Sequence, residues 1–401
     1  MNWKHYLENK LPICNSRNVQ KGKSSMLDTC RKPLLEVCDL LDSKRVPVTS
    51  NKRIHGPYPY YGANGIQDYV NDYIFDDDLV LLAEDGGNFG SKDKPIAYRV
   101  SGKCWVNNHA HVLKPREGLN VDYLCYSLMY YDTKGLVNGA TRQKLTQAAM
   151  KNIKIPILAY NEQLKIVKRI AMVSTLINNR KKELSLLDKL VKSRFLERFG
   201  DPIINPFDYP IHELGDYIEN LTSGSRGWAR YYADDGNAWF ITIKNVKNCK
   251  ITVDNMQTIN APDNAEAKRT RVKEGDLLIS ITADLGRTGV VTKEIANKGS
   301  YINQHLSCIR LNRHALEPLY VAYFMESEAG KRQFKKENQS AVKAGINFKS
   351  IQSLKLMVPP LVRQEEFLSF YKQVDKSKMA VQRSLDELET LKKSLMQTYF
   401  G

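Results

Sequence analysis

The sequence repeats itself after 201 residues. When the chain is slid against itself by that distance, residues 137–200 align with residues 338–401 without a gap, and 11 of the 64 positions are identical. Some of the identities are leucines spaced as on one face of a helix, such as Leu184 with Leu385, and both copies end on Phe-Gly. A period of this length is far beyond the roughly 20 to 50 residues of a solenoid repeat. The pattern therefore predicts a duplicated domain.

The duplication continues upstream at a slightly smaller offset. Residues 105–113 (WVNNHAHVL) match residues 301–309 (YINQHLSCI) 196 positions later, which aligns an asparagine and a histidine in the two copies. Five extra residues in the second copy, placed between Met325 and Asn338, account for the change of offset. The two copies therefore follow each other in the same order.

Two shorter matches extend the repeat toward the N-terminus. DDLVLL (77–82) aligns with GDLLIS (275–280), and PLLEVCDLLD (33–42) aligns with PIHELGDYIE (210–219). Residues 1–32 lie outside the repeat and have no role that we can predict.

Each copy begins with the pattern of a mixed α/β globule. Short runs rich in Val, Ile and Tyr between turn residues, such as IFDDDLVLLA (74–83) and GVVTKEI (289–295), are typical of strands. A helical segment and a further short strand follow in each copy. We predict an α+β fold with two tandem globules, over residues 33–158 and 201–360.

Each copy ends with a pattern typical of one long helix, over residues 159–200 and 361–401. Residues 161–199 contain no Pro or Gly, and apolar side chains recur there every three or four positions, as in a heptad seam. A helix of about 35 residues is about 50 Å long, which is too long to be buried in one small globule. We predict that the two helices pair as an antiparallel coiled coil with pseudo-twofold symmetry. The alternative is that each helix lies on its own globule.

The composition favours a polyanionic partner. Lys and Arg number 60 against 44 Asp and Glu, which gives a formal net charge of +16. Such a balance suits nucleic acid or an anionic membrane surface. No run approaches the roughly 18 apolar residues of a membrane span, and the N-terminal MNWKHYLENK has no apolar signal core. We therefore favour nucleic acid as the partner and expect a cytoplasmic protein.

Motifs for catalysis or metal binding are incomplete. GGNFGSKD (86–93) lacks the spacing of a phosphate-binding loop, NPFD (205–208) lacks the second proline of an amino-methyltransferase motif, and PDNAEAK (262–268) is too short for a nuclease motif. The seven cysteines are scattered without a C-x-x-C pair. We predict no catalytic site and no metal site.

What remains is a set of side chains that can read bases or hold phosphates. Arg and Lys can bridge guanine O6 and N7, Asn and Gln can bridge adenine N6 and N7, and Lys and Ser can contact phosphates. Any one of them can also be an ordinary surface or structural residue. The candidate DNA-binding residues are Tyr60, Asn64, Asn88, Lys92, Lys94, Asn107, Asn108, His111 and Arg142 in the first copy, and Ser225, Arg226, Arg230, Lys244, Arg271, Arg287, Asn303, Gln304 and Lys343 in the second.

These segments together resemble a known family. LLAEDGGNFGSK (81–92), WVNNHAHVL, GATRQKL (139–145) and EQLKIVKRI (162–170), followed by a second copy of the same plan, are similar to the specificity subunit of type I restriction–modification systems. The resemblance covers residues 33–401. The second copy has SITADLGRTG (280–289) where the first has LLAEDGGNFG, so we expect the two globules to read different sequences.

The resemblance implies a bacterial, non-catalytic DNA-recognition subunit. Each globule would be a target-recognition domain for one half of a two-part site, and the helices would set the spacer and dock two methyltransferase subunits. Restriction subunits would join the full complex. This chain would need no cofactor, since S-adenosylmethionine, Mg²⁺ and ATP would belong to the partner subunits. The alternatives are a self-contained DNA methyltransferase or nuclease, and a coiled-coil interaction protein with no DNA role.

Overall fold

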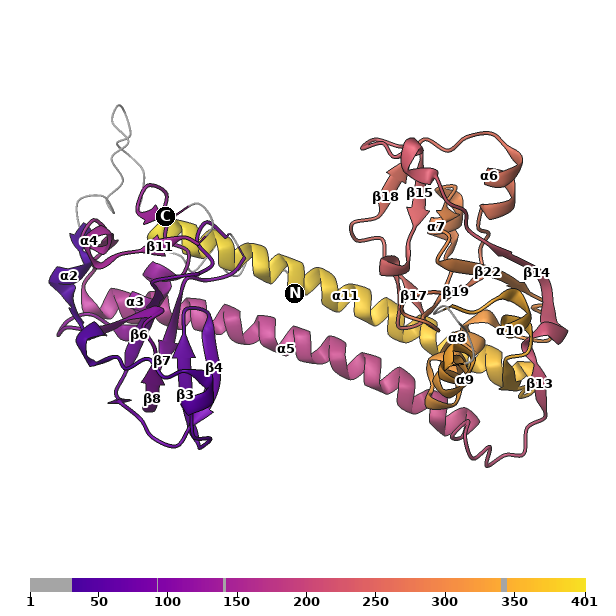
Figure 1. Cartoon of the computed structure of the whole chain (residues 1–401), viewed down its shortest axis with the longest axis horizontal. Coiled ribbons are helices and arrows are strands. Elements are labelled where there is room, and N and C mark those ends of the chain that lie inside the picture. Colours follow the sequence, from indigo (N-terminus) through magenta and orange to yellow (C-terminus); the bar gives the residue numbers. More distant parts are fainter. Residues whose placement is uncertain (1–30, 92, 140–141, 340–344) are drawn as a thin grey trace. The chain divides into compact units, whose positions relative to one another are not determined.

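The computed structural model describes residues 31–91, 93–139, 142–339 and 345–401 (Figure 1). The chain divides into two compact units. Of the described residues, those between 31 and 179 and between 385 and 401 form unit 1, and those between 180 and 384 form unit 2. The boundaries fall inside the two longest helices, α5 (Tyr160–Phe199) and α11 (Leu361–Phe400). Each long helix therefore has one end in each unit.

Unit 1 contains two four-stranded sheets. The main sheet is antiparallel, with the order β2 (Cys38–Leu40), β9 (Ala110–Pro115), β6 (Leu79–Ala83) and β7 (Ala97–Val100). All five residues of β6 are fully buried, because the second sheet's core lies on one face and a helix on the other. The second sheet has the order β4 (Gly65–Val70), β3 (Tyr58–Gly62), β8 (Lys103–Val106) and β5 (Phe75–Asp76).

Short elements complete unit 1. Helix α3 (Val121–Met129) packs on β6 and β7, and the Asn120 side chain caps its first turn by accepting hydrogen bonds from two backbone N–H groups. The remaining elements are β1 (Arg31–Pro33), α2 (Leu34–Val37), η2 (Asp42–Lys44), η3 (Ser50–Lys52), β10 (Val137–Asn138), β11 (Lys144–Leu145), α4 (Gln147–Met150) and β12 (Lys154–Pro156).

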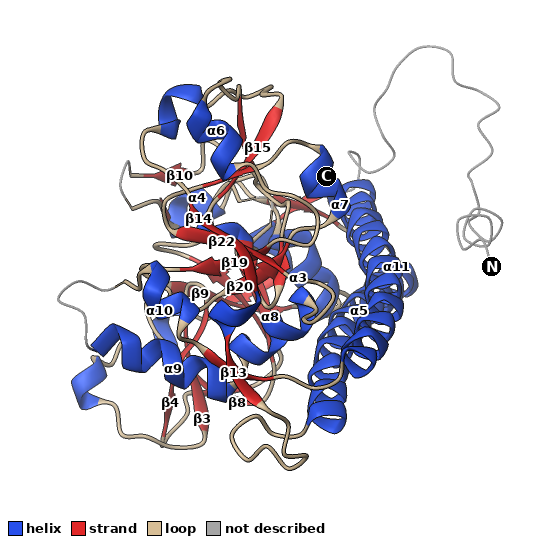
Figure 2. Cartoon of the chain, turned by 90° about the vertical axis from the view of Figure 1, so that its right-hand side faces the viewer, coloured by secondary structure: helices blue, strands red, loops and turns tan. Residues whose placement is uncertain are grey.

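Unit 2 repeats this plan. Its main sheet has the order β14 (Ile218–Ser223), β22 (Leu306–Leu311), β19 (Leu277–Ser280) and β20 (Thr288–Val290). Its second sheet has the order β18 (Gln257–Ile259), β15 (Ala238–Ile241) and β21 (Tyr301–Ile302). In both units the second sheet holds one parallel pair, β3 with β8 and β15 with β21. The predicted α+β class with two tandem globules is confirmed, and Figure 2 shows the mixture of helices and strands.

The other elements of unit 2 include one insertion. Helix α8 (Pro318–Glu326) corresponds to α3, and α9 (Glu328–Gln339) lies where the repeat gains its five extra residues. The rest are β13 (Ile211–Glu213), η4 (Leu214–Tyr217), η5 (Trp228–Tyr231), η6 (Ile243–Asn245), β16 (Val246–Lys247), β17 (Lys250–Ile251), α6 (Ala265–Thr270), α7 (Lys293–Asn297), α10 (Phe348–Gln352) and β23 (Lys355–Met357).

The structure corrects the register of the repeat at two places. Pro33 pairs with Lys154 and Glu213 pairs with Lys355, so the N-terminal match has an offset of 180, whereas the sequence alignment of PLLEVCDLLD with PIHELGDYIE uses 177.

The second correction concerns the main sheets. In the main sheets Leu81 pairs with Val112, and Leu278 pairs with Cys308. Since residues 112 and 308 are equivalent at an offset of 196, β6 aligns with β19 at an offset of 197, whereas the sequence alignment of DDLVLL with GDLLIS uses 198. The error is one residue, which in a strand would place every side chain on the opposite face.

The long helices pack against each other in antiparallel fashion. In unit 1, Ile166 and Ile170 near the start of α5 share a core with Met396 near the end of α11. In unit 2, Phe195 near the end of α5 packs on Phe367 near the start of α11. The predicted antiparallel pairing is confirmed, and the two helices run side by side in both views (Figures 1 and 2). Each helix begins on the globule of its own copy and ends against the globule of the other copy.

Candidate nucleic-acid interface

The repeated asparagine and histidine shape a turn in each unit. In unit 1 the Asn107 side-chain oxygen accepts a hydrogen bond from the backbone N–H of His109 at 2.8 Å, between β8 and β9. In unit 2 Asn303 accepts one from the N–H of His305 at 3.2 Å, between β21 and β22. An Asx side chain that bonds its own backbone two residues on fixes a turn. The repeat of these residues is therefore explained by backbone geometry.

In unit 1 this turn lies beside two other chain segments. The Glu84 N–H donates to the carbonyl of His109 at 2.9 Å, and the Leu145 N–H donates to the carbonyl of Glu84 at 2.7 Å. The segment after β6, the turn before β9 and strand β11 therefore meet at one edge of the main sheet. Side chains from all three segments can reach a common ligand there.

Unit 2 builds the same edge with other residues. The Ile281 N–H donates to the carbonyl of His305 at 2.9 Å, and the Ile346 N–H donates to the carbonyl of Ile281 at 3.0 Å. Ile281 therefore takes the place of Glu84, and Ile346 that of Leu145. The backbone frame is shared and the side chains on it differ.

The side chains on the unit 1 frame form a polar cluster. Arg142 Nε lies 2.6 Å from Asp85 Oδ1, and His109 Nδ1 lies 3.4 Å from Asp85 Oδ2. Asn64, from the β3–β4 turn, donates its side-chain N–H to the carbonyl of Gly86 at 3.0 Å. Asn64 and Arg142 are both exposed. The structure thus brings together two candidate residues around a carboxylate that the sequence analysis did not select.

On the unit 2 frame a hydroxyl replaces the carboxylate. Thr282 stands where Asp85 stands in unit 1, and its Oγ1 lies 2.5 Å from His305 Nδ1. Gln304 Nε2 lies 3.2 Å from the other ring nitrogen of that histidine. Lys244 is exposed and occupies the position of Asn64, because β15 and β3 are equivalent strands.

A second polar group in unit 2 is organised by an arginine. The Arg269 guanidinium donates to Ser225 Oγ at 2.9 Å and to the carbonyl of Ser223 at 2.8 Å. The Ser225 backbone forms an isolated β-bridge with Asn303, so this loop lies at the same turn. Arg271 is exposed and forms a bridge with Tyr301. Arg269 is not among the candidate residues selected from the sequence.

Three candidates point into the interior of unit 1. Tyr60 is 1% exposed, and its hydroxyl bonds the backbone of Val48. Asn107 is buried and donates to the side chain of Gln67 at 3.0 Å. His111 has no exposed surface. These side chains present no edge to a ligand, so we leave them out of the proposed surface.

The remaining candidates lie on or near the surface in separate places. Asn88 donates to the carbonyl of Pro95 at 3.3 Å, and Arg287 forms an ion pair with Asp284. Lys94, Asn108, Arg226 and Arg230 are exposed. Lys92 and Lys343 lie outside the described residues.

Buried charges in unit 1 balance one another. His111 Nδ1 lies 2.6 Å from Asp42 Oδ2, and Glu84 is nearby at 3.6 Å. These three groups could suggest a cation site, but the Arg45 guanidinium already contacts both carboxylates, at 3.1 and 2.7 Å. Lys144 lies 3.2 Å from Glu84 as well. We therefore assign the cluster to the framework of the globule.

This network lowers the pKa of Asp42. Burial alone raises that pKa, but the contact with His111, the hydrogen bond from the Val112 N–H and the charge of Arg45 outweigh it. The carboxylate is thus held in its charged form and ties the segment after β2 to β9.

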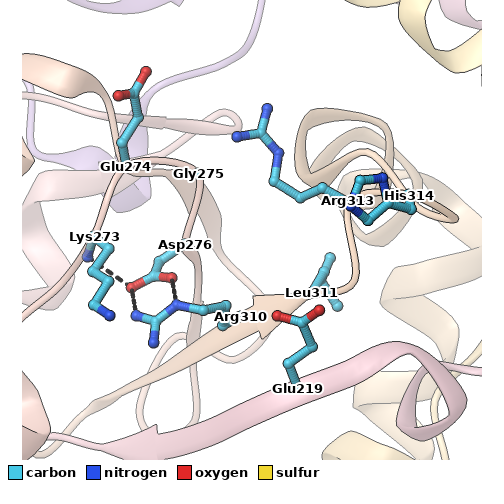
Figure 3. A pocket seen from close by; sticks show the side chains of 9 residues that line it. All are labelled: Glu219, Lys273, Glu274, Gly275, Asp276, Arg310, Leu311, Arg313 and His314. Atoms are coloured by element: carbon cyan, nitrogen blue, oxygen red, sulfur yellow. Dashed lines mark hydrogen bonds and ion pairs between the residues drawn. The ribbon is translucent and has the colours of Figure 1, made fainter.

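One polar pocket of about 300 Å³ lies at the opposite end of the unit 2 main sheet (Figure 3). The Arg310 guanidinium donates two hydrogen bonds to the Asp276 carboxylate, at 2.9 and 2.8 Å, and the backbone N–H of Lys273 donates to the same carboxylate. Asp276 is 1% exposed and is fully paired. The pocket begins where β19 starts, whereas Thr282 follows the end of that strand, so it is separate from the candidate interface.

The described cysteines are not poised as nucleophiles. Burial raises the pKa of Cys38, Cys104 and Cys125 to about 12. Burial raises the pKa of Cys249 and Cys308 further still. Thiols with such values stay protonated near neutral pH and do not attack a substrate.

Comparison with known proteins points to one family. A protein-family model described as "Type I restriction modification DNA specificity domain" matches residues 29–186 and 211–390. A putative type I restriction enzyme specificity subunit from Haemophilus influenzae is 28% identical over 380 residues, covering 91% of this chain and 89% of that protein. The MjaVIII specificity subunit from Methanocaldococcus jannaschii is 19% identical, covering 89% of this chain and 88% of that protein.

Solved structures show the same fold. The chain is similar to the crystal structure of a type I restriction–modification S subunit from M. genitalium, with a TM-score of 0.57, 14% identity, and coverage of 95% of this chain and 99% of that one. It is also similar to a chain from a study of complex assembly and conformational transition of the type I system, with a TM-score of 0.54, 18% identity, and coverage of 92% and 97%. Among the described residues, no helix is long and apolar enough to cross a membrane.

Proposed function

Because the chain belongs to the family of type I restriction–modification DNA specificity domains, we propose that each of its two globules reads one half of an asymmetric, two-part DNA site. Specificity subunits are the non-catalytic components of these complexes, so the chemistry is carried out by other subunits. The net charge of +16 supports binding to a polyanion.

The observation that carries this proposal is one backbone frame with two sets of side chains. At equivalent positions unit 1 has Asn64 and Asp85, whereas unit 2 has Lys244 and Thr282. Different donors and acceptors on the same frame select different bases. A palindromic target would need the same side chains in both units.

We propose that the long helices set the spacer between the half-sites. Each has 40 residues, which corresponds to about 60 Å of helix, and each has its two ends in different units. Two short half-sites joined at a fixed separation are recognised far more selectively than either alone.

We further propose that the chain docks two methyltransferase subunits and, in the complete complex, restriction subunits. The similarity to a chain studied in the assembly of a type I complex supports this. S-adenosylmethionine, Mg²⁺ and ATP would then be bound by those partners. The helices offer the longest continuous surfaces for docking.

The first test is co-expression with the modification subunits of the same system in a cell that lacks adenine methylation, followed by genome-wide mapping of N6-methyladenine. We expect an asymmetric motif in two parts with a fixed unspecified gap. A single continuous motif would contradict the assignment of one half-site to each globule. Methylation by this chain alone would support a self-contained methyltransferase instead.

The spacer is tested by removing one heptad from each long helix. We expect the gap of the motif to change or methylation to be lost, while an unchanged gap would refute the role of the helices as a ruler. If the protein is only a coiled-coil interaction protein, binding to DNA will be weak and log K will not fall steeply with log salt.

A further inference from the structure

We propose that Arg142, held by Asp85, reads a guanine in the half-site recognised by unit 1. This inference rests on the proposed function and deepens it, because it names a base and the residue that selects it. Unit 2 has no equivalent pair, since Thr282 replaces the carboxylate.

The pair is built at the exposed edge of the main sheet. Arg142 precedes β11, and its Nε lies 2.6 Å from Asp85 Oδ1. The Asp85 side chain is 21% exposed and that of Arg142 is 61% exposed. The Asp85 backbone forms an isolated β-bridge with Lys144, and its carboxylate lies 3.4 Å from His109 Nδ1. The Asp85 carboxylate thus lies beside the Nε atom of Arg142, and most of the arginine side chain is exposed.

This contact decides which donors of Arg142 remain. A guanidinium has five N–H donors in a planar fork, and the Asp85 carboxylate forms its ion pair at the Nε end of that fork. Among the described residues Arg142 has no other ion pair and its side chain is 61% exposed, so its terminal Nη1 and Nη2 groups remain available to a ligand. These two donors match two acceptors that lie side by side.

Guanine presents such a pair in the major groove. Its O6 and N7 atoms both accept, whereas adenine offers one acceptor and one donor at the same edge. Arginine has no acceptor, so it cannot satisfy the adenine N6 group. The fork therefore favours guanine over adenine.

The carboxylate also argues against a simple phosphate contact. A phosphate bound to the fork would lie close to the negative charge of Asp85, which opposes its binding. A guanine edge carries no net charge and pays no such penalty. The carboxylate thus orients the guanidinium and at the same time reduces its attraction to the DNA backbone.

Two neighbours complete the position. Gly86 has φ of +69°, and a Cβ on it would lie 3.4 Å from Arg142 Nε, so a glycine suits both the turn and the arginine. Asn64 donates to the carbonyl of Gly86 at 3.0 Å. Its side-chain oxygen accepts no hydrogen bond from the described residues and can accept one from an adjacent base.

The test measures binding of the complete complex with modification subunits to short duplexes that carry the mapped motif. Each base pair of both half-sites is replaced in turn, and binding is measured at several salt concentrations. For the unaltered chain we expect one position in the unit 1 half-site at which guanine is preferred by roughly five- to a hundredfold.

Arg142→Ala should remove that preference and leave every other position unchanged. The discrimination in the unit 2 half-site serves as an internal control for folding. Lys151→Gln, which removes one exposed positive charge from unit 1 without touching Asp85, should keep the preference. If Arg142→Ala instead weakens binding to all duplexes equally and lowers the salt slope by about one, Arg142 contacts a phosphate and the proposal is wrong.

Two variants of Asp85 distinguish its role in orienting Arg142 from the effect of its negative charge on DNA binding. Asp85→Asn keeps an oxygen for Nε and should retain the guanine preference, while binding to all duplexes becomes tighter because the negative charge is gone. Asp85→Ala should tighten binding in the same way but lose most of the preference. An unchanged preference in Asp85→Ala would refute the role of the carboxylate. No base preference in either half-site of the unaltered complex would refute the proposed function itself.

Discussion

The two units hold the ends of the long helices in different ways at equivalent positions. In unit 2, Phe199 at the end of α5 lies 4.7 Å from the ring centre of Tyr320, and Phe195 packs on the same tyrosine at 5.7 Å. In unit 1, Phe400 at the end of α11 lies 5.2 Å from Tyr123 in the same edge-on arrangement, but Met396 stands where unit 2 has Phe195.

The same contrast continues on the other helix. Phe367 and Tyr371 of α11 complete the aromatic cluster of unit 2, and the equivalent residues of α5 in unit 1 are Ile166 and Ile170. Aromatic pairs add roughly 0.5 to 1.5 kcal/mol beyond the area that they bury. The repeat therefore preserves the position of the docking site, while the packing inside it has diverged toward a stronger contact in unit 2.

These aromatic contacts explain why both copies end in the same two residues, Phe and Gly. The Phe-Gly endings are docking segments, and each contacts the globule of the other copy. Unit 1 has one more contact at this end, because the Arg31 side chain donates a hydrogen bond to the backbone carbonyl of Gly401 at 2.8 Å.

The largest effect is expected from removing the docking rings. Phe199→Ala should destabilise unit 2 by about 4 kcal/mol, because the ring is fully buried among three others. Phe400→Ala should destabilise unit 1 by about 2 kcal/mol, since that ring is partly exposed. Amide hydrogen exchange in α8 and α3 measures the two effects. Leu196→Ala, on the exposed side of α5, is the control, and equal losses in both units would refute the difference between the docking sites.

A smaller loss of stability, equal in the two units, is expected when either of two buried glutamines is replaced. Gln163 accepts from the Asn120 N–H at 2.8 Å and donates to the carbonyl of Leu158 at 2.8 Å. Gln364 makes the equivalent bonds with Glu317 and Pro359, both at 2.8 Å.

Replacing either glutamine by leucine leaves buried backbone groups without partners, which should cost about 3 kcal/mol in each unit. Urea unfolding followed by exchange in α3 and α8 gives the two values. Gln373→Leu, on the exposed face of α11, should change stability little. A large inequality between Gln163→Leu and Gln364→Leu would mean that the repeat has not kept this support.

Exchanging the divergent pair tests the aromatic contribution directly. Phe195→Met gives unit 2 the residue of unit 1 and should cost about 2 kcal/mol, because four ring contacts are lost. Met396→Phe should also destabilise unit 1, by about 1 kcal/mol, because a larger ring has to displace the neighbours that already bury Met396. A gain of stability in Met396→Phe would show that the unit 1 site is underpacked.

The repeat predicted the architecture well, because the architecture depends on sequence patterns that persist when individual residues are substituted. Heptad spacing gave both long helices, and the five-residue shift gave the place of α9. The expected strand over residues 289–295 is only partly right, because β20 ends at Val290 and α7 begins at Lys293. Thr292 caps that helix, which is the signal that could have revealed it.

The candidate site was harder to predict because burial and pairing decide it. His111 lies on a strand buried on both faces, so alternation along β9 could not tell which way it points. Asp85 was overlooked because a carboxylate is not itself a phosphate ligand; its role depends on Arg142, which is distant in sequence. Such pairs become visible only when the fold brings the two segments together.

The smallest effect is expected from acid, and it should be confined to the charge network of unit 1. The pKa of Asp42 is lowered by its hydrogen bonds and by Arg45, although burial opposes this. Its contribution to stability is therefore complete above the ordinary aspartate value of about 3.9 and is lost as the pH falls through the lowered pKa. In unit 2, Thr222 pairs with Cys308 where unit 1 has Leu41 bonded to Val112, so the residue equivalent to Asp42 is Ser223, which carries no charge.

We expect the exchange rates of β9 amides, corrected for the intrinsic effect of pH, to rise below about pH 4 in the unaltered chain. In Asp42→Asn the same amides should be less protected at neutral pH and should show a weaker dependence on acid, because the group that titrates is gone. Amides of β22 should not change between the two proteins. If Asp42→Asn alters β9 and β22 equally, the network stabilises more than its own globule, and the contrast between the units does not extend to their charges.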